Sequence, residues 1–357
     1  MRRAQKTQAA VRTEGKPSAG RRRTVPVMAL LILLLAAAFL LSVTVGRYGI
    51  PVDQLLRILF GKLLGLAPTW PDTVEKVLFN VRLPRILCGM MVGAALSGSG
   101  AAYQGIFKNP MVSPDILGAS AGAGFGAALA ILNNFSILGI EAAAFLFGMA
   151  AVALTYFLSS SIGRNMNAVL VLVLTGMVVQ SLFSAFTSVI KYEADPNNKL
   201  PEITFWLMGG LSSSTGKQVL MMLVPFAAGM IPLFLFRWRI NILSFGEEEA
   251  RALGVDTRRT RAVLILAATL LTSASIAVSG MIGWVGLIIP HLARLIVGPN
   301  YKVLLPASVL MGASFLLLVD DIARTVLITE IPLGILTAII GAPFFLYLLY
   351  RGRSAWE

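Results

Sequence analysis

Apolar runs of about twenty residues recur along the whole chain and are separated by short polar or charged connections. A helix needs about 20 apolar residues to cross the roughly 30 Å hydrocarbon core of a bilayer. Since backbone polar groups in lipid must be hydrogen-bonded within the protein, we interpret these runs as membrane-spanning helices. About ten are expected, at 25–46, 84–107, 115–133, 139–161, 168–190, 217–236, 262–282, 284–297, 303–326 and 333–350.

The composition excludes a soluble domain. Of 357 residues, 57% are hydrophobic and 13% charged, with a mean hydropathy of +0.80. We expect an all-α polytopic membrane protein with one membrane domain at 25–350, a disordered basic tail at 1–24 and a short end at 351–357. A cleaved signal peptide is the alternative for the N-terminus, although the apolar run continues to about Val45, which favours a retained helix.

Lysines and arginines predict the orientation, because short positive loops stay on the cytoplasmic side. Both termini are expected inside, together with a coupling loop at 237–261. The predicted inside segments carry Arg21, Arg22, Arg23, Lys108, Arg164, Arg237, Arg239, Arg251, Arg258, Arg259, Arg261, Arg351 and Arg353. The net charge of +13 therefore reflects topology, and its division among loops argues against nucleic-acid binding.

Several chemical sites can be set aside. Cys88 and His291 are the only residues of their types, so no intrachain disulfide, cysteine cluster or histidine-based metal site is expected. The stretch 210–218 resembles a phosphate loop, but its glycine spacing is one residue too long and Gln218 stands where a magnesium-binding Ser or Thr is required. No metal, nucleotide or other cofactor is expected on this chain.

Small residues recur at helix-packing intervals, which lets helix backbones approach closely in a membrane. The glycines predicted to pack in this way are Gly89, Gly93, Gly118, Gly122 and Gly126. The segment Ser97-Gly98-Ser99-Gly100 together with His291 also allows a serine protease dyad, because a buried serine needs a nearby base to become a nucleophile. Helix packing is the simpler interpretation.

Arg82 and Arg85 lie where structure alone does not favour them. The topology puts them on the outer side, and Pro84 puts them at a helix start, where the helix dipole disfavours cations. As i and i+3 neighbours they could present a paired positive site to carboxylates of an external partner. Snorkelling to lipid headgroups is the alternative. For Arg324, neutralisation by Asp320 and Asp321 within the helix is equally open.

The cytoplasmic loop is predicted to contain a short helix. Ser244 and Glu247 form a capping-box pattern, Gly254 supplies a stop, and another helix could begin at Asp256 or Thr257. Apolar residues among charges fit a docking element for a cytoplasmic partner. A helix resting on the lipid surface is the alternative.

Together these motifs resemble the permease subunits of FecCD or BtuC-type ABC importers, which carry iron-siderophore chelates, haem or cobalamin. The resemblance covers nearly everything after residue 40. It rests on Arg82-Leu-Pro-Arg85, Gly93-Ala-Ala-Leu-Ser-Gly98, Asn109-Pro110 with Pro114 and Leu117-Gly118, Trp206-Leu-Met-Gly-Gly210, Glu249-Ala-Arg-Ala-Leu-Gly254, Gly286-Leu-Ile-Ile-Pro-His-Leu-Ala-Arg294, and Ile331-Pro-Leu-Gly334 leading to Gly341-Ala-Pro343.

The resemblance implies a BtuC-like type II permease that pairs with a second copy, two cytoplasmic ATPases and an outer substrate-binding protein. Arg82, Arg85 and Arg324 match arginines that meet glutamates of the binding protein. The fifth span and the segment through Trp206 match elements that line and gate the path, although the polar stretch 193–199 departs from some relatives. The coupling helix that docks on the ATPase corresponds to Phe245, Gly246, Glu247, Glu249, Ala250, Arg251, Leu253 and Gly254.

The expected activity is therefore transport without bond chemistry, in the cytoplasmic membrane of a prokaryote. ATP and Mg²⁺ would be bound by the partner ATPase. Ferric siderophore is the first expectation for the cargo, with cobalamin, haem or an oxyanion as alternatives. An ion-coupled secondary transporter is a remote alternative, and its candidate acids are Asp115, Glu141, Asp320 and Asp321.

Overall fold

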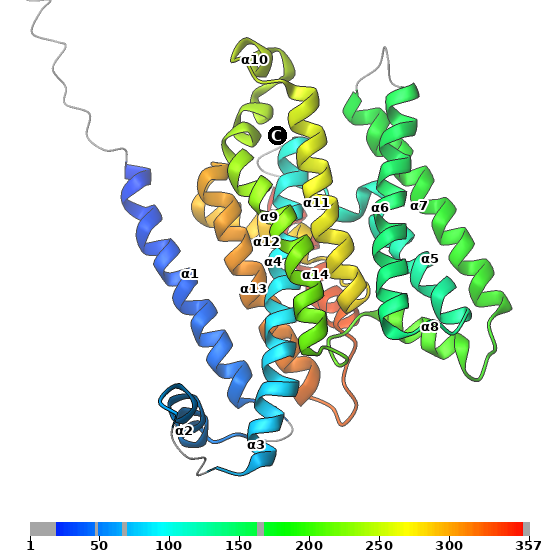
Figure 1. The fold of residues 1–357 in the computed structure, drawn as a ribbon. Coiled ribbons are helices and arrows are strands. Elements are labelled where there is room, and N and C mark those ends of the chain that lie inside the picture. Colours follow the sequence, from blue (N-terminus) through cyan, green and yellow to red (C-terminus); the bar gives the residue numbers. More distant parts are fainter. Residues whose placement is uncertain (1–18, 47–48, 66–69, 163–167, 353–357) are drawn as a thin grey trace, which may run out of the picture.

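The computed structural model describes residues 19–46, 49–65, 70–162 and 168–352, and this part of the chain is helical without strands (Figure 1). Each of the ten expected spans has a helix. Seven helices are long and apolar enough to cross a membrane, and α5, α12 and α14 are shorter apolar helices. The ten are α1 (Ala19–Thr44), α4 (Leu83–Ile106), α5 (Ala119–Leu132), α6 (Ile137–Ile162), α7 (Ala168–Glu193), α9 (Gly216–Phe245), α11 (Thr257–Ser279), α12 (Val285–Val297), α13 (Tyr301–Thr325) and α14 (Leu333–Gly352).

Shorter elements connect these helices. They are α2 (Val52–Leu63), α3 (Asp72–Lys76), the π-helical turn η1 (Val77–Arg82), the 3₁₀ turn η2 (Pro114–Leu117), α8 (Lys199–Met208) and α10 (Glu247–Ala252). Helices α2 and α8 come in addition to the ten expected spans. α1 begins at Ala19, so residues 19–24 of the expected tail are helical. Residues 1–18 and 353–357 lie outside the described part.

Helix α4 forms the centre of the bundle and packs against α9, α11, α12 and α13. Nearly all of it is buried, because small side chains let its neighbours approach its backbone. Gly93 lies against the backbone of Gly312 in α13, and Gly100 lies against the backbone of Gly286 in α12. These close approaches fix how α12 and α13 sit on α4.

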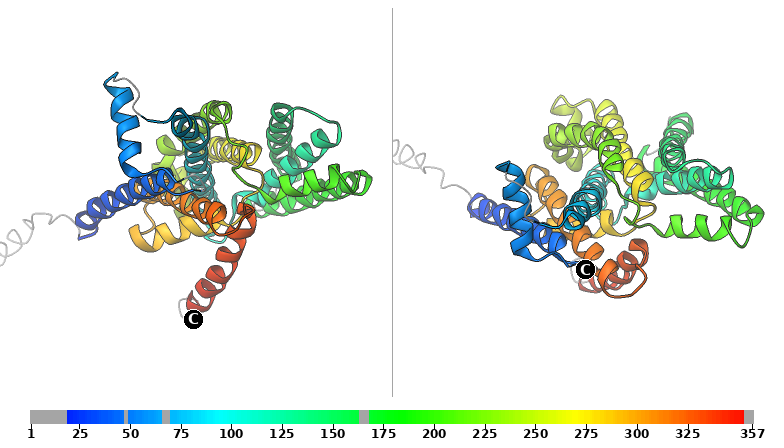
Figure 2. Two further views of the ribbon diagram at one scale, coloured as in Figure 1. Left: turned by 90° about the horizontal axis from the view of Figure 1, so that it is seen from below. Right: turned by 60° about the horizontal axis from the view of Figure 1, so that its bottom comes forward.

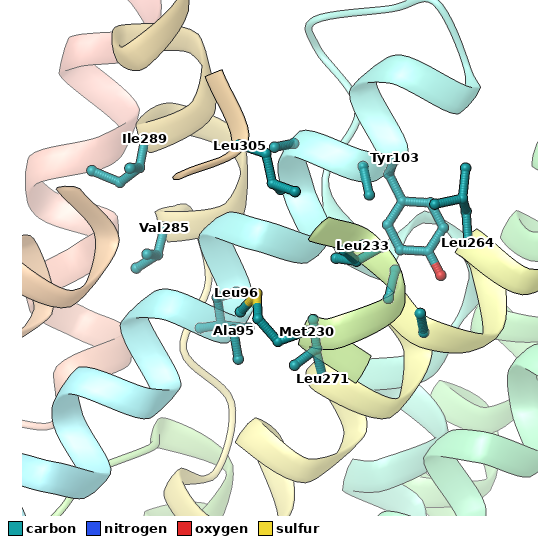
Figure 3. Close-up of a cluster of buried hydrophobic side chains, with 14 of the residues drawn as sticks. Ala95, Leu96, Tyr103, Met230, Leu233, Leu264, Leu271, Val285, Ile289 and Leu305 are labelled. Carbon is teal, nitrogen blue, oxygen red and sulfur yellow. The ribbon is translucent and has the colours of Figure 1, made fainter. Parts of the chain in front are cut away.

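Larger side chains fill the space where α4 meets α9, α11 and α12 (Figure 3). Leu96, Met230 and Leu271 gather at one level of the cluster, and Val285 and Ile289 approach from α12. Tyr103 is fully buried, and its hydroxyl lies 3.1 Å from the hydroxyl of Thr269, which satisfies the one polar group that it brings into this core.

The predicted packing glycines occupy different environments. Gly122 and Gly126 face the backbone of α6, at the carbonyls of Phe147 and Ala143, and Gly89 faces side chains only, those of Leu211 and Leu317. Gly118 differs from the expectation: it precedes α5 with a φ of +89° and makes only ordinary contacts, so the left-handed turn is what requires a glycine there.

The two ends of the bundle carry different helices. Figure 1 shows α10 and the beginning of α1 in the upper half, and α2, α3 and α8 in the lower half. Seen from below in Figure 2, α14 projects from the bundle and α6, α7 and α8 form a group on another side. The two ends therefore present different elements to the two sides of a membrane.

The expected loop at 237–261 is shorter than predicted. Helix α9 continues to Phe245, α10 follows after Gly246, and α11 begins at Thr257, capped by the side chain of Asp256. The capping-box prediction for Ser244 and Glu247 was wrong: the Ser244 hydroxyl donates to the carbonyl of Asn241 inside α9 (2.6 Å). The seventh span thus supplies the second helix that was expected in this loop.

Candidate partner-docking sites

The turn η1 positions Arg82 and Arg85. Pro84 lacks a backbone N–H, and its ring would clash with the carbonyl four residues earlier in a regular α-helix. The wider π-helical turn directly before it accommodates this proline. Arg82 ends the turn and Arg85 lies in the first turn of α4; their side chains point into the protein, with residue exposures of 4% and 9%.

The Arg85 guanidinium is held by two carboxylates. Its Nε and Nη2 donate to Asp320 in α13, at 2.9 and 2.7 Å. Its Nη1 and Nη2 donate to the two oxygens of Glu330, both at 2.9 Å. Asp320 also lies 3.7 Å from Nε of Arg324. Within the permease alone, Arg85 is thus paired inside the chain.

Arg82 and Arg324 bind the last turn of α1. Arg324 Nη2 donates to the carbonyl of Ser42 (2.7 Å), and Arg82 Nη1 donates to the carbonyls of Val43 and Thr44, the latter at 3.2 Å. Helix C-terminal carbonyls lack partners within the helix and carry partial negative charge, which favours arginine there. The Ser42 hydroxyl in turn donates to Asp321 (2.7 Å).

Two expectations for these residues can be separated. Neutralisation of Arg324 within its own helix is confirmed, because it pairs with both Asp320 and Asp321. The three arginines converge at the end of the bundle that carries α2 and α3. Their role in docking a partner stays a prediction.

A cavity of about 370 Å³ adjoins Arg85. Its wall includes Trp206 of α8, Glu141 of α6, the glycine pair Gly209-Gly210 and Glu330. Gln218 donates to Oε1 of Glu141 (3.0 Å), whereas Oε2 has no hydrogen-bond partner among the described residues. This end of the bundle therefore combines paired arginines with a cavity whose lining includes Glu141, Glu202 and Glu330.

At the opposite end, apolar side chains on both sides of α10 are exposed. Phe245 and Leu253, which flank the helix, are 74% and 62% exposed. Ala250 is fully buried and anchors the helix to the core. Arg251 is exposed, and the Glu249 carboxylate folds over Gly246. For Glu247 only the backbone is described, within α10. Gly254 ends the turn with a φ of +77°.

A polar clasp, made of Asn241, Asn300, Tyr301, Arg294 and Gln104, lies below α10. Asn241 in α9 donates to the side chain of Asn300 (2.9 Å) and accepts from the backbone of Tyr301 (2.8 Å). Arg294 in α12 donates to the Tyr301 hydroxyl (3.0 Å) and to Gln104 of α4 (3.3 Å). The helix that leads into α10 is thereby linked to α4, α12 and α13.

The catalytic alternative finds no support in these contacts. The Ser99 hydroxyl donates to the carbonyl of Leu96 (3.0 Å), and Ser97 lies against Gly312. Neither serine is hydrogen-bonded to His291 in the part of the chain that the structure describes. The serine-glycine pairs therefore serve the close packing of α4.

Residues 33–351 match the sequence model of the FecCD transport family. The chain belongs to this family. It is a permease of an ABC importer and a multi-pass protein of the cytoplasmic membrane, which replaces the secondary-transporter and protease alternatives.

Relatives agree with this assignment over nearly their whole length. The chain is 44% identical to the molybdate import system permease protein MolB of Haemophilus influenzae, over 90% of this chain and 94% of that protein. It is 42% identical to a Helicobacter pylori protein described as a probable iron chelatin transport system permease, over 79% and 85%. A solved inward-facing structure, described as a metal-chelate type ABC transporter, superposes with a TM-score of 0.82 at 42% identity, over 91% and 99%.

Sequence reasoning missed several residues of this FecCD permease. Glu330 accepts from Arg85 and Ser42 donates to Asp321, and neither contact was foreseen, nor was the clasp beneath α10. Glu330 directly precedes the quoted Ile331-Pro-Leu-Gly334 motif, so an acid beside a motif turn was the available signal. For Ser42 no signal exists in the sequence, because its partner Asp321 lies 279 positions away.

Proposed function

We propose that this chain is the permease of an ATP-driven importer for a metal chelate, with ferric siderophore as the first candidate. The observation that carries the proposal is the 42% identity to a metal-chelate type transporter over 99% of that chain. The relative from Helicobacter pylori, described as an iron chelatin permease, supports the same cargo class. Cobalamin and haem belong to this class of bulky metal complexes.

The apolar surface beside α8 and α14 also supports a bulky cargo. A cavity of about 400 Å³ is lined by Leu207, Met208, Met281, Trp284, Ile335 and Ile339. No charged side chain is among its described lining residues. Such a wall makes weak, non-directional contacts, which lets a large chelate pass without being trapped.

An oxyanion is the second candidate cargo. The relative from Haemophilus influenzae, named as a molybdate permease, is 44% identical over 94% of its length. Recognition of a small oxyanion would then belong to the binding protein, because the described apolar cavity offers it no cationic partner.

The proposed assembly has two copies of this chain, two cytoplasmic ATPases that bind ATP and Mg²⁺, and one outer binding protein. In this assembly α10 with Phe245 and Leu253 docks on the ATPase, and both termini are cytoplasmic. Arg82, Arg85 and Arg324 form the docking site for the binding protein. The second copy packs beside α8 and α14, where Ile335 and Ile339 are exposed as long as the chain is by itself.

The proposed mechanism is alternating access. Nucleotide binding closes the two ATPases, α10 moves with them, and the clasp carries this movement to α4, α12 and α13, so that the two permease copies reorient. The chain itself makes and breaks no covalent bond. Its membrane domain, expected at 25–350, acts as one unit in this scheme.

The test is uptake by the complete complex in liposomes. The permease, its ATPase and its binding protein are reconstituted, and ATP-dependent uptake is measured for ferric siderophores, haem, cobalamin and molybdate. Uptake of a chelate alone supports the first candidate, and uptake of molybdate alone supports the second. Failure of all four, with ATPase activity still stimulated by the binding protein, would contradict both cargo proposals.

A further inference from the structure

The two carboxylates on Arg85 differ in how firmly they are held. Asp320 projects from the last two turns of α13, and its side chain is 3% exposed. Glu330 comes from the connection between α13 and α14, and its side chain is 30% exposed. Both pairs are charge-assisted hydrogen bonds of normal length. Glu330 is thus the outer and more accessible partner of the guanidinium.

The geometry of the Glu330 pair is the one that an incoming carboxylate would use. Two parallel N–H groups of Arg85 point at the two oxygens of Glu330, the fork arrangement that arginine forms with a free carboxylate. Asp320 takes the fork formed by Nε and Nη2, and the one N–H of Nη1 that is left cannot form a fork by itself. A carboxylate arriving from outside can form a comparable fork on Arg85 only in the place of Glu330.

The connection that carries Glu330 is bonded to the segment beside α8. Leu333 N–H donates to the carbonyl of Gly209 (2.9 Å), directly after the end of α8. Gly334 packs against the carbonyls of Met208 and Met281. Both Glu330 and Gly209 line the cavity that Trp206 closes from α8. Displacement of Glu330 would therefore act on the backbone at the end of α8.

We propose that Glu330 is a further residue of the docking site, an in-chain carboxylate that occupies Arg85 until a carboxylate of the binding protein replaces it. The proposal rests on the docking role given to Arg85 under the proposed function. Arg85 keeps two carboxylate partners both in the free permease and after the binding protein docks, so the exchange leaves no buried charge without a partner. It also releases the α13–α14 connection only when the binding protein is present.

Three neutral or conservative variants test the exchange in the complete complex, held in lipid nanodiscs with the ATPase. Glu330→Gln removes the competing charge, and binding-protein affinity should tighten by about tenfold, because a charge-assisted hydrogen bond no longer has to be broken. Glu330→Asp keeps the charge but draws the carboxylate back, and should tighten binding by less. Glu202→Gln makes the same charge change on an exposed residue lining the same cavity, and should change affinity by less than about twofold.

Salt dependence gives a second readout. In the wild type one ion pair replaces another at Arg85, so its contribution to the salt dependence of docking cancels. In Glu330→Gln a new pair forms without losing one, so affinity should fall more steeply with ionic strength. Equal affinities and equal salt slopes for Glu330→Gln and wild type would overturn the exchange. Equal tightening by Glu202→Gln would overturn it as well, because the effect would then be long-range charge.

Arg85→Lys separates this inference from the docking site itself. Lysine keeps a cation for Asp320 but loses the fork, so docking should weaken and Glu330→Gln should add nothing in that background. If Arg85→Lys docks like the wild type, the docking role of Arg85 fails. If Arg85→Lys docks weakly while Glu330→Gln has the affinity of the wild type, the docking role of Arg85 stands and only the exchange is excluded. Thermal unfolding of each variant confirms that the compared complexes are folded.

Discussion

Gly93 of α4 and Gly312 of α13 face each other so closely that neither position has room for a Cβ atom. In Gly93→Ala the methyl group would overlap the carbonyl of Gly312, which is backbone and cannot rotate away. We expect a loss of about 1–3 kcal/mol in the free energy of unfolding, measured in nanodiscs. Gly216→Ala is the control, since no atom lies within 4 Å of the added methyl group. Equal stability of the two variants would contradict the close approach of α4 and α13 at Gly93 and Gly312.

Removal of the Tyr301 hydroxyl should weaken coupling between ATP hydrolysis and transport. In Tyr301→Phe, Arg294 loses the acceptor at 3.0 Å and keeps Gln104 at 3.3 Å, so α12 is less firmly linked to α13 and α9. The number of ATP molecules hydrolysed per cargo imported should rise by about two- to tenfold, the range for a lost hydrogen bond. Tyr192→Phe, at a residue 91% exposed, is the control. An unchanged ratio with normal stability would exclude the clasp as a transmitter.

Loss of the exposed apolar groups beside α10 should weaken association with the ATPase. We expect Phe245→Ala and Leu253→Ala each to raise the dissociation constant by about tenfold, because buried apolar anchors dominate interfaces. Leu64→Ala removes a side chain of similar exposure, 67%, at the opposite end and should have no effect. Normal ATPase binding combined with weaker binding of the isolated 245–254 peptide to lipid vesicles would instead favour the interfacial-helix alternative.

Glu141 should be dispensable for energising transport. Glu141→Gln preserves its size and its contact with Gln218 but removes the buried charge. ATP-driven uptake should stay within about twofold of the wild type, because no ion has to be carried, and a protonophore should leave both proteins unaffected. Two results together would instead support ion coupling through this carboxyl group. They are loss of wild-type uptake on adding the protonophore and loss of uptake in Glu141→Gln without it.

The helices were predictable because lipid imposes length and apolarity on every span. Even the short α12 was separated from α11, although the expected seventh span ran to 282 and α11 ends at Ser279. The C-terminal extent of α9 was not predictable. Charged Arg237 and Arg239 suggested a loop, yet both guanidinium groups lie over aromatic rings of α9, those of Phe234 and Phe236, and the helix continues past the apolar region.

Arg82, Arg85 and Arg324 show the limit of sequence reasoning. The pairing of Arg324 with its i−3 and i−4 acids follows from helix geometry. The partner of Arg85 in α13 lies 235 positions away, and Glu330 lies 245 positions away. Only the three-dimensional packing of α4 against α13 brings these charges together, so no local pattern could reveal them.

The attachment of α1 through Ser42 has a consequence for the order in which the protein is made. Helix α1 is synthesised first, but Arg324 and Asp321, which bind its last turn, belong to the ninth span. The carbonyls at that end must therefore find water or lipid headgroups until nearly the whole chain has entered the membrane. Assembly of this permease is thus completed at the end of the bundle that carries α2 and α3, when one of the last helices to be translated binds the first.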